Sequence, residues 1–143
     1  MPGINILDTF NFSLTMRPHK ILIIEDEPEI RLILAMSLQH SGVFEPILAK
    51  DGVEGIEIAQ QEKPDLILID VVMPRMDGYA TCRVIKENPA LRDIPVIFLT
   101  AKTDRKEVDR AIKAGACGYL AKPFDPLLLA DQIKKIAEKA VGS

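Results

Sequence analysis

Short apolar segments alternate with longer amphipathic segments along most of the chain. The short segments have four to six residues, and the long ones carry apolar residues at helical spacing. This pattern predicts strands at 21–24, 44–49, 65–70, 95–100 and 117–121. It predicts a helix after each strand, at 29–42, 51–64, 77–89, 104–115 and 125–140.

Strands that alternate with helices of this length indicate an α/β fold with a parallel sheet and helices on both faces. The segments "LILI" and "VIFL" are apolar at successive positions, as strands covered on both faces are. Asp51 and Asp77 are the expected N-caps of their helices, and Pro126 lies near the first turn of the last helix.

The first 19 residues stand apart from this alternation. Apolar and polar residues alternate in "FNFSLTM", residues 10–16, which is typical of a half-buried extended arm. We therefore divide the chain into an N-terminal extension or arm, residues 1–19, and one α/β domain, residues 20–143. A tail without fixed structure is the alternative for the extension.

Composition argues against several classes of function. The net charge is −3, from 18 basic and 21 acidic residues, and does not favour nucleic acid or an anionic membrane as a partner. No apolar run approaches the roughly 18 residues of a membrane span, and the N-terminus lacks the pattern of a secretory signal. Cys82 and Cys117 lack C-x-x-C spacing, which predicts free thiols in a reducing cytoplasm.

The residues that can carry chemistry stand where the predicted strands end. In open parallel α/β sheets, ligands bind outside the carboxyl ends of the strands. Glu25 and Asp26 follow the first strand, and Asp70 ends the third. Thr100 ends the fourth strand, and Lys122 follows the fifth. We therefore expect three carboxylates, a hydroxyl and an ammonium group to converge at one edge of the sheet.

Three convergent carboxylates, without a cluster of His or Cys, favour a hard divalent cation, Mg²⁺ above all. Such an ion explains how the acids of "IIEDEP" can stay ionised side by side at the end of a buried strand. Lys122 adds a further positive charge.

The segments "IIEDEP", "LILIDVVMPRMDGY", "VIFLTAK" and "GYLAKPF" resemble the receiver domain of two-component response regulators, from about Lys20 to Val141. The resemblance implies a doubly wound, flavodoxin-like fold with five parallel strands in the order 2-1-3-4-5 and five helices. It implies a cytoplasmic phospho-acceptor signalling protein rather than an enzyme.

The resemblance also implies roles for the residues at the sheet edge. Asp70 would accept the phosphoryl group, and Lys122 and Thr100 would contact it. Asp26 would bind Mg²⁺ directly and Glu25 through water, with Asp70 as a further ligand.

Further positions take their roles from the resemblance alone. Val72 would supply a backbone carbonyl to the metal, and Pro123 would follow a cis peptide bond. Tyr119 would be an aromatic switch that turns inward after Thr100 moves. Val72 and Lys102 would tune hydrolysis of the acyl phosphate.

The sequence departs from the usual receiver pattern at two places. The acid pair is Glu25–Asp26 where two Asp residues are commoner, which keeps the charge and lengthens one side chain. The segment "AGACGYL" lacks the paired acids common before the fifth strand in receivers attached to winged-helix DNA-binding domains. This difference weakens any prediction of the dimer that those domains form.

We expect a stand-alone receiver, because about 120 residues after Lys20 are taken up by the domain. The phosphodonor would be a histidine kinase or a histidine phosphotransfer protein. The signal would leave through an unknown downstream protein bound to the face of helix 104–115, strand 117–121 and the last helix, or by passing on the phosphoryl group. Neither nucleic acid nor membrane insertion is expected.

Three other interpretations explain the sequence less well. A degenerate receiver that only binds proteins would usually lack the acceptor or the acid pair, and both are present. A Mg²⁺-dependent aspartyl phosphatase needs a second acid two residues after the nucleophile, where this chain has Val72. A flavin-binding domain needs a phosphate-binding loop after the first strand, where this chain has "EDEPE".

Overall fold

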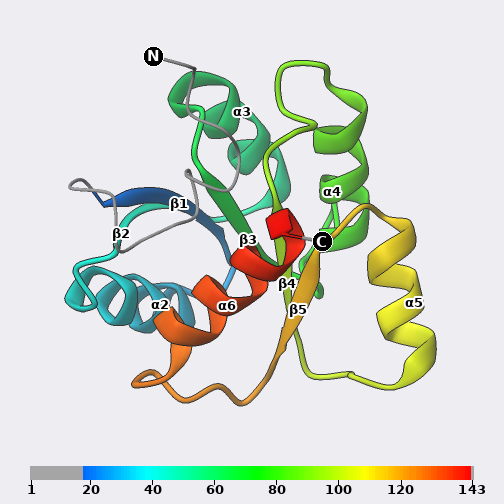
Figure 1. The fold of residues 1–143 in the computed structure, drawn as a ribbon. Helices are drawn as coiled ribbons and strands as arrows, with labels where there is room; N and C mark the ends of the chain where they lie inside the picture. Colours follow the sequence, from blue (N-terminus) through cyan, green and yellow to red (C-terminus); the bar gives the residue numbers. More distant parts are fainter. Residues whose placement is uncertain (1–17, 143) are drawn as a thin grey trace.

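The structure, a computed structural model, describes residues 18–142. In this part of the chain, five parallel strands form one sheet: β1 (His19–Ile24), β2 (Phe44–Ala49), β3 (Leu66–Asp70), β4 (Val96–Thr100) and β5 (Gly118–Ala121). Their order across the sheet is β2-β1-β3-β4-β5 (Figure 1). The predicted fold class and strand order are therefore confirmed.

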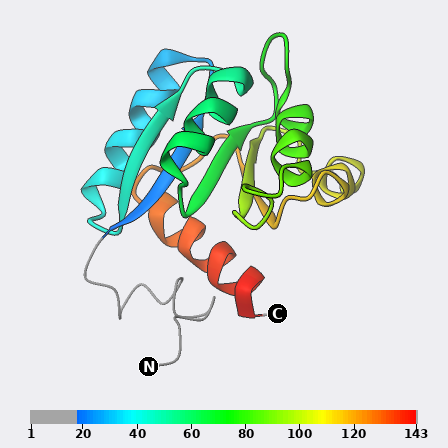
Figure 2. The same cartoon turned by 90° about the horizontal axis from the view of Figure 1, so that it is seen from above.

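Helices follow the strands in the same part of the chain: α2 (Pro28–His40), α3 (Gly52–Glu62), α4 (Gly78–Glu87), α5 (Arg105–Lys113) and α6 (Leu129–Gly142). Two of them, α2 and α6, cover one face of the sheet, and α3, α4 and α5 cover the other (Figure 1, Figure 2). None of the helices between residues 18 and 142 has the length and apolar character needed to cross a membrane.

Each strand divides its side chains between two cores, because successive side chains of a strand point to opposite faces. Ile21 and Ile23 of β1 pack with the side chains of α2 and α6. Leu22 and Ile24 pack with those of α3, α4 and α5. All four are fully buried, which explains why residues 21–24 are apolar at successive positions rather than at alternate ones.

The predicted N-caps are confirmed. The carboxylate of Asp51 accepts a hydrogen bond from the backbone N–H of Glu54 at 2.8 Å, at the start of α3. Asp77 accepts one from Ala80 at the same distance, at the start of α4. These bonds satisfy N–H groups that have no partner within the first turn of a helix.

The last helix begins later than the sequence pattern indicates. The Asp125 carboxylate accepts a hydrogen bond from the Leu127 N–H at 2.9 Å, and its carbonyl accepts one from the Leu128 N–H at 3.0 Å. These local bonds close a turn over residues 126–128, so that α6 starts at Leu129. The side chains of Leu127 and Leu128 are left exposed beside the helix.

The extension predicted at residues 1–19 lies outside the described residues as far as residue 17. His19 already belongs to β1, and its backbone N–H donates to the carbonyl of Val43 at 2.8 Å. The chain therefore enters the sheet beside the start of β2.

Gly78 brings the start of α4 against the end of β3. A Cβ atom added to Gly78 would lie 2.5 Å from the carbonyl oxygen of Asp70 and 2.9 Å from the Cα of Val71. Both are backbone atoms, which cannot swing aside as the end of a flexible side chain can. The Gly78 N–H also donates to the Val71 carbonyl at 2.9 Å. The glycine is therefore required by a close backbone approach.

We expect Gly78→Ala to lower the free energy of unfolding by about 1–3 kcal/mol, the usual cost of an overpacked site. Urea unfolding measures this loss, and the NMR signal of the Val71 amide should move because the contact is local. Gly42→Ala is the control for the NMR measurement: a Cβ there meets no atom within 4 Å, so that it strains its own turn at positive φ but should leave the Val71 signal unmoved. Unchanged stability and an unmoved Val71 signal in Gly78→Ala would contradict the required approach.

Candidate functional site

Three carboxylates meet at the carboxyl ends of β1 and β3. Glu25 and Asp26 directly follow β1, and Asp70 is the last residue of β3, its neighbour in the sheet. One carboxylate oxygen from each of the three residues lies within 4.8 Å of the others. The parallel register of the two strands thus places acids that are 45 positions apart in one pocket.

Glu25 is the most deeply buried of these acids, with 1% of its surface exposed, and Asp70 follows with 4%. Burial raises the pKa of Glu25 to about 7, against the hydrogen bond from the Glu27 N–H at 3.2 Å, which favours the carboxylate. The negative charge of Asp70 raises this pKa further, and the positive charge of Lys122 lowers it. The pocket therefore holds its negative charges at a cost.

Lys122 brings a positive charge to the same pocket from the loop after β5. Its Nζ atom lies 3.0 Å from Oδ1 of Asp70 and 3.5 Å from Oε1 of Glu25. Burial acts to lower the pKa of Lys122, but the hydrogen bond and charge of Asp70, together with the charge of Glu25, raise it overall. The side chain therefore stays cationic. The Lys122–Pro123 peptide bond is cis, as the resemblance implies.

The donor set fits a hard divalent cation. Oδ1 of Asp26 is buried and has no hydrogen-bond partner, and a buried oxygen left unpaired costs free energy. The other groups of the pocket are carboxylates too, and no His or Cys belongs to the cluster found among residues 18–142. Carboxylate oxygens are the ligands that Mg²⁺ prefers. Glu25, Asp26 and Asp70 could together hold such an ion.

Thr100 lies at the pocket edge but points its hydroxyl at its own loop. The Lys102 N–H donates to the Thr100 Oγ1 at 3.0 Å, and that hydroxyl donates to the Lys102 carbonyl at 3.2 Å. The side chain of Lys102 itself is exposed. Val72, two residues after Asp70, is 77% exposed, so that its side chain faces solvent.

Tyr119 lies on β5, where it pairs in register with Phe98 of β4. Its side chain is 37% exposed. It borders a cavity of about 190 Å³ that is also lined by Val108 and Ile112 of α5. Tyr119 therefore occupies an outward position next to α5 in this structure.

One partly buried contact between α4 and α5 was not predicted from the sequence. The Tyr79 hydroxyl donates to Oε2 of Glu107 at 2.7 Å, and the Arg110 guanidinium lies 4.1 Å from the centre of the Tyr79 ring. Tyr79 also packs edge-on against Phe98, with ring centres 5.2 Å apart. Burial and the Glu107 carboxylate raise the pKa of Tyr79 to about 12. Tyr79 therefore joins α4, β4 and α5.

Sequence signals could identify only part of this contact. Glu107 and Arg110 are three positions apart on a predicted helix, so that a shared face is expected for them. Their partner lies 28 positions earlier in the chain, and no local spacing points to it.

Comparison with known proteins gives consistent results. The family described as "Response regulator receiver domain" matches residues 21–134. The alkaline phosphatase synthesis transcriptional regulatory protein PhoP of Bacillus subtilis is 35% identical over 121 residues, which are 85% of this chain and 49% of PhoP. Response regulator PleD of Caulobacter vibrioides is 35% identical over 118 residues, which are 82% of this chain and 26% of PleD. The chain spans about half the length of most of the curated relatives it matches.

Solved structures agree with this match. The chemotaxis protein CheY4 of Vibrio cholerae is 30% identical and superposes with a TM-score of 0.79, over 83% of this chain and 98% of CheY4. A response regulator from Chloroflexus aurantiacus is 33% identical, with a TM-score of 0.78, over 85% of this chain and 98% of that one.

The raised pKa of Glu25 predicts a pH-dependent stability for the metal-free domain. A pKa of about 7, against the ordinary value of 4.5, means that the folded protein holds this proton more tightly than the unfolded chain does. The free energy of unfolding therefore falls as the pH rises between these two values. Above a pH of about 7 the full decrease in the free energy of unfolding is present.

We expect Glu25→Gln to remove this loss, because the amide has no charge to bury. In EDTA the variant should unfold at a higher temperature than the wild type at about pH 8, and the two should differ little at about pH 5. Thermal unfolding followed by circular dichroism measures this, with Glu57→Gln on the exposed side of α3 as control. A wild type equally stable at both pH values would show that Glu25 does not carry this cost.

Proposed function

The chain belongs to the response regulator receiver family, a class of phospho-acceptor signalling modules, and within it we propose that Asp70 accepts the phosphoryl group. The observation that carries the proposal is the buried cluster of Glu25, Asp26 and Asp70 at one edge of the sheet. Receiver domains bind Mg²⁺ and imply a histidine kinase as a partner. The proposal assigns this activity to residues 20–143, with residues 1–19 as an extension.

The cation would be held by the side chains of Glu25, Asp26 and Asp70 and by the backbone carbonyl of Val72. When bound, Mg²⁺ neutralises charge on the acids and on the phosphoryl oxygens. Burial raises the pKa of Glu25, and a positive charge bound beside this carboxylate would offset that effect and favour its ionised form.

The reaction transfers a phosphoryl group from a phosphohistidine to a carboxylate. An oxygen of Asp70 forms a bond to phosphorus while the bond between phosphorus and the histidine nitrogen breaks. That nitrogen keeps the electron pair and takes up a proton. Lys122, 3.0 Å from the Asp70 carboxylate, is placed to stabilise the charge on the transferred group. The phosphodonor is a histidine kinase or a histidine phosphotransfer protein.

Thr100 and Tyr119 would connect the acceptor to a binding face. The Thr100 hydroxyl would exchange its contacts with Lys102 for a phosphoryl oxygen, and Tyr119 would then turn inward. The face formed by α5, β5 and α6 exposes Ile112 and Tyr119, which suits a downstream protein. Action as a stand-alone cytoplasmic receiver, or as a relay intermediate, remains a prediction.

We expect Asp70→Asn to abolish phosphorylation without unfolding the domain, because the amide is a poor nucleophile of nearly equal size. Protein treated with acetyl phosphate and Mg²⁺ should gain the mass of one phosphoryl group, and the variant should not. Asp77→Asn is the matched control, since Asn can also cap α4. A stable adduct on Asp70→Asn would assign the acceptor elsewhere, and an unmodified wild type would favour a receiver that only binds proteins.

We expect the acyl phosphate to hydrolyse slowly, because Val72 cannot hydrogen-bond the attacking water and its methyl groups would shield the phosphorus atom from solvent. Val72→Asn should accelerate the loss of phosphate by about tenfold, or about 1.4 kcal/mol of barrier. The decay of phosphorylated protein after removal of the donor measures this, with Val84→Asn on α4 as control. Equal half-lives, or a slower Val72→Asn, would show that Val72 does not govern access of water.

A further inference from the structure

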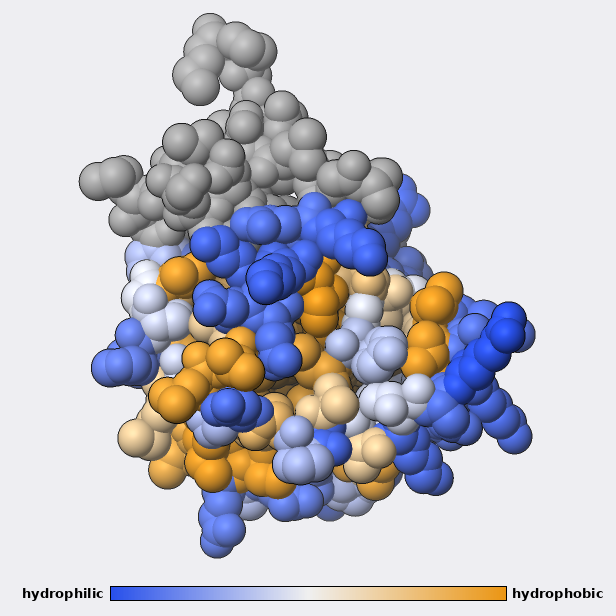
Figure 3. Space-filling view, turned by 60° about the horizontal axis from the view of Figure 1, so that its bottom comes forward, coloured by the Kyte–Doolittle hydropathy of each residue, from blue (hydrophilic) through white to orange (hydrophobic). Residues whose placement is uncertain are grey.

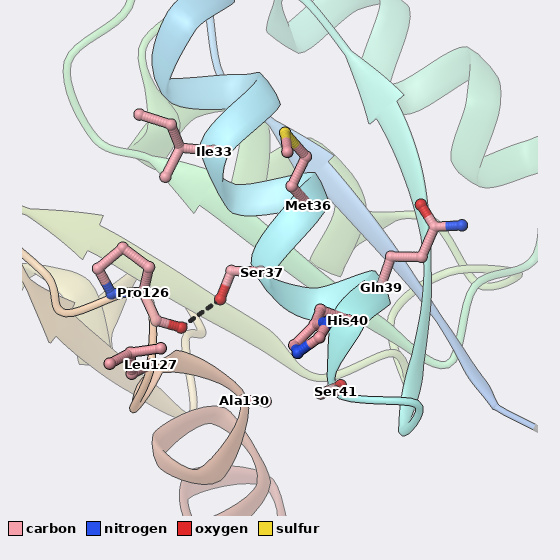
Figure 4. Close-up of a pocket in the computed structure, with 9 residues that line it drawn as sticks. All are labelled: Ile33, Met36, Ser37, Gln39, His40, Ser41, Pro126, Leu127 and Ala130. Carbon is pink, nitrogen blue, oxygen red and sulfur yellow. Dashed lines mark hydrogen bonds between the residues drawn. The ribbon is translucent and has the colours of Figure 1, made fainter.

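An apolar groove runs between α2 and the turn that precedes α6. Apolar residues gather in a patch on this side of the molecule (Figure 3). The groove encloses about 620 Å³, with Ile33, Met36 and Ser37 of α2 on one side and Pro126 and Leu127 on the other (Figure 4). Met36 is 62% exposed and Leu127 is 88% exposed. We call this surface the α2–α6 groove.

One end of the α2–α6 groove lies beside the point where the chain enters the sheet. His40 and Ser41, at the end of α2, line the groove there. Ser41 is two residues before Val43, whose carbonyl accepts the hydrogen bond from the His19 N–H at 2.8 Å. The residues that precede His19 therefore join the domain next to this end of the groove.

The sequence before His19 has the character that the groove would accept. Residues 10–16, "FNFSLTM", place an apolar side chain at every second position and contain no charge. In an extended segment, alternate side chains share one face. The side chains that line the groove are apolar or uncharged, apart from the imidazole of His40. The two surfaces therefore match in polarity, and His40 is the only ionisable group among the residues that line the groove.

The segment is long enough to cover the groove. Seven extended residues span about 23 Å, and α2 rises about 12 Å between Ile33 and Ser41, so that part of the segment is enough to reach from one end of the groove to the other. Only Arg17 and Pro18 separate residues 10–16 from His19. So short a tether keeps the effective concentration of the segment at the groove high, near the millimolar range of short linkers.

We propose that residues 10–16 of this chain dock in the α2–α6 groove, with Phe10, Phe12, Leu14 and Met16 facing it. Met16 lies at the Ser41 end, and Phe10 lies toward Ile33 and Pro126. The docked segment removes apolar surface from water at little cost in polar groups.

Docking would also restrain the loop that carries Lys122. The Ser37 hydroxyl donates to the carbonyl of Pro126 across the floor of the groove (Figure 4). Pro126 is four residues after Lys122 in the same loop. A segment seated on both α2 and Pro126 therefore holds the loop against α2. The proposed docking involves no atom of Asp70, so that it stands apart from the proposed function.

The ε-methyl group of Met36 is a direct reporter of docking. NMR on the full chain with methyl-labelled methionine, assigned with Met36→Leu, should show contacts from the Met36 methyl to Phe ring protons and a ring-current shift. The Phe10→Ser/Phe12→Ser variant should lose both. The Asn11→Ser/Thr15→Ser variant changes the opposite face of the same segment and should keep both. These variants lie outside the domain core and test docking without unfolding it.

A Met36 methyl signal that is the same in the wild type and in Phe10→Ser/Phe12→Ser would overturn the proposal. A Phe contact that weakens on dilution of the protein would overturn it too, because the occupant would then be the segment of a second copy. Ring contacts that persist at all concentrations and vanish only in Phe10→Ser/Phe12→Ser would support it.

Discussion

Excess negative charge at the end of a buried strand is the constraint on which this molecule depends. The register of β1 and β3 sets Glu25 beside Asp70 with almost no exposed surface, and Asp26 adds a buried oxygen without a partner. Lys122, which lies late in the sequence but contacts both Asp70 and Glu25, offsets part of this charge. A site built in this way is costly when it is bare and is stabilised by a cation that binds among the acids.

The fold could be predicted because its signals are local. The double-sided apolar runs of β1 and β3 show that both faces of the sheet are covered, and this requires helices on both sides. The predicted start of α6 was wrong because one side chain, Asp125, closes a turn that helical spacing cannot reveal. At the site, the meeting of three acids follows from where parallel strands end. The Tyr79–Glu107 bond and the approach of Gly78 to Asp70 depend on side-chain direction and backbone distance between remote segments.

The α2–α6 groove and the acidic pocket share one loop. Lys122 lies at its start beside Asp70, and Pro126 and Leu127 lie at its end in the wall of the groove. The loop is short, and the ammonium group of Lys122 at its start has to stay within hydrogen-bond distance of the Asp70 carboxylate. Whatever covers the α2–α6 groove therefore contacts the loop that positions Lys122. The groove and the acidic pocket are in this way parts of one structural unit.

Tyr79 has a consequence of its own. Its hydroxyl and ring contact Glu107 and Arg110 on α5, and its chain neighbour Gly78 abuts the carbonyl of Asp70. Only the Tyr79 side chain and the backbone of Gly78 therefore separate α5 from Asp70. If Asp70 is the acceptor, a protein that displaced α5 on binding would act on it through these contacts, and by thermodynamic reciprocity phosphorylation of Asp70 would change the affinity for that protein. In this domain a partner bound to α5 could thus change how readily Asp70 is phosphorylated, as well as detect its phosphorylation.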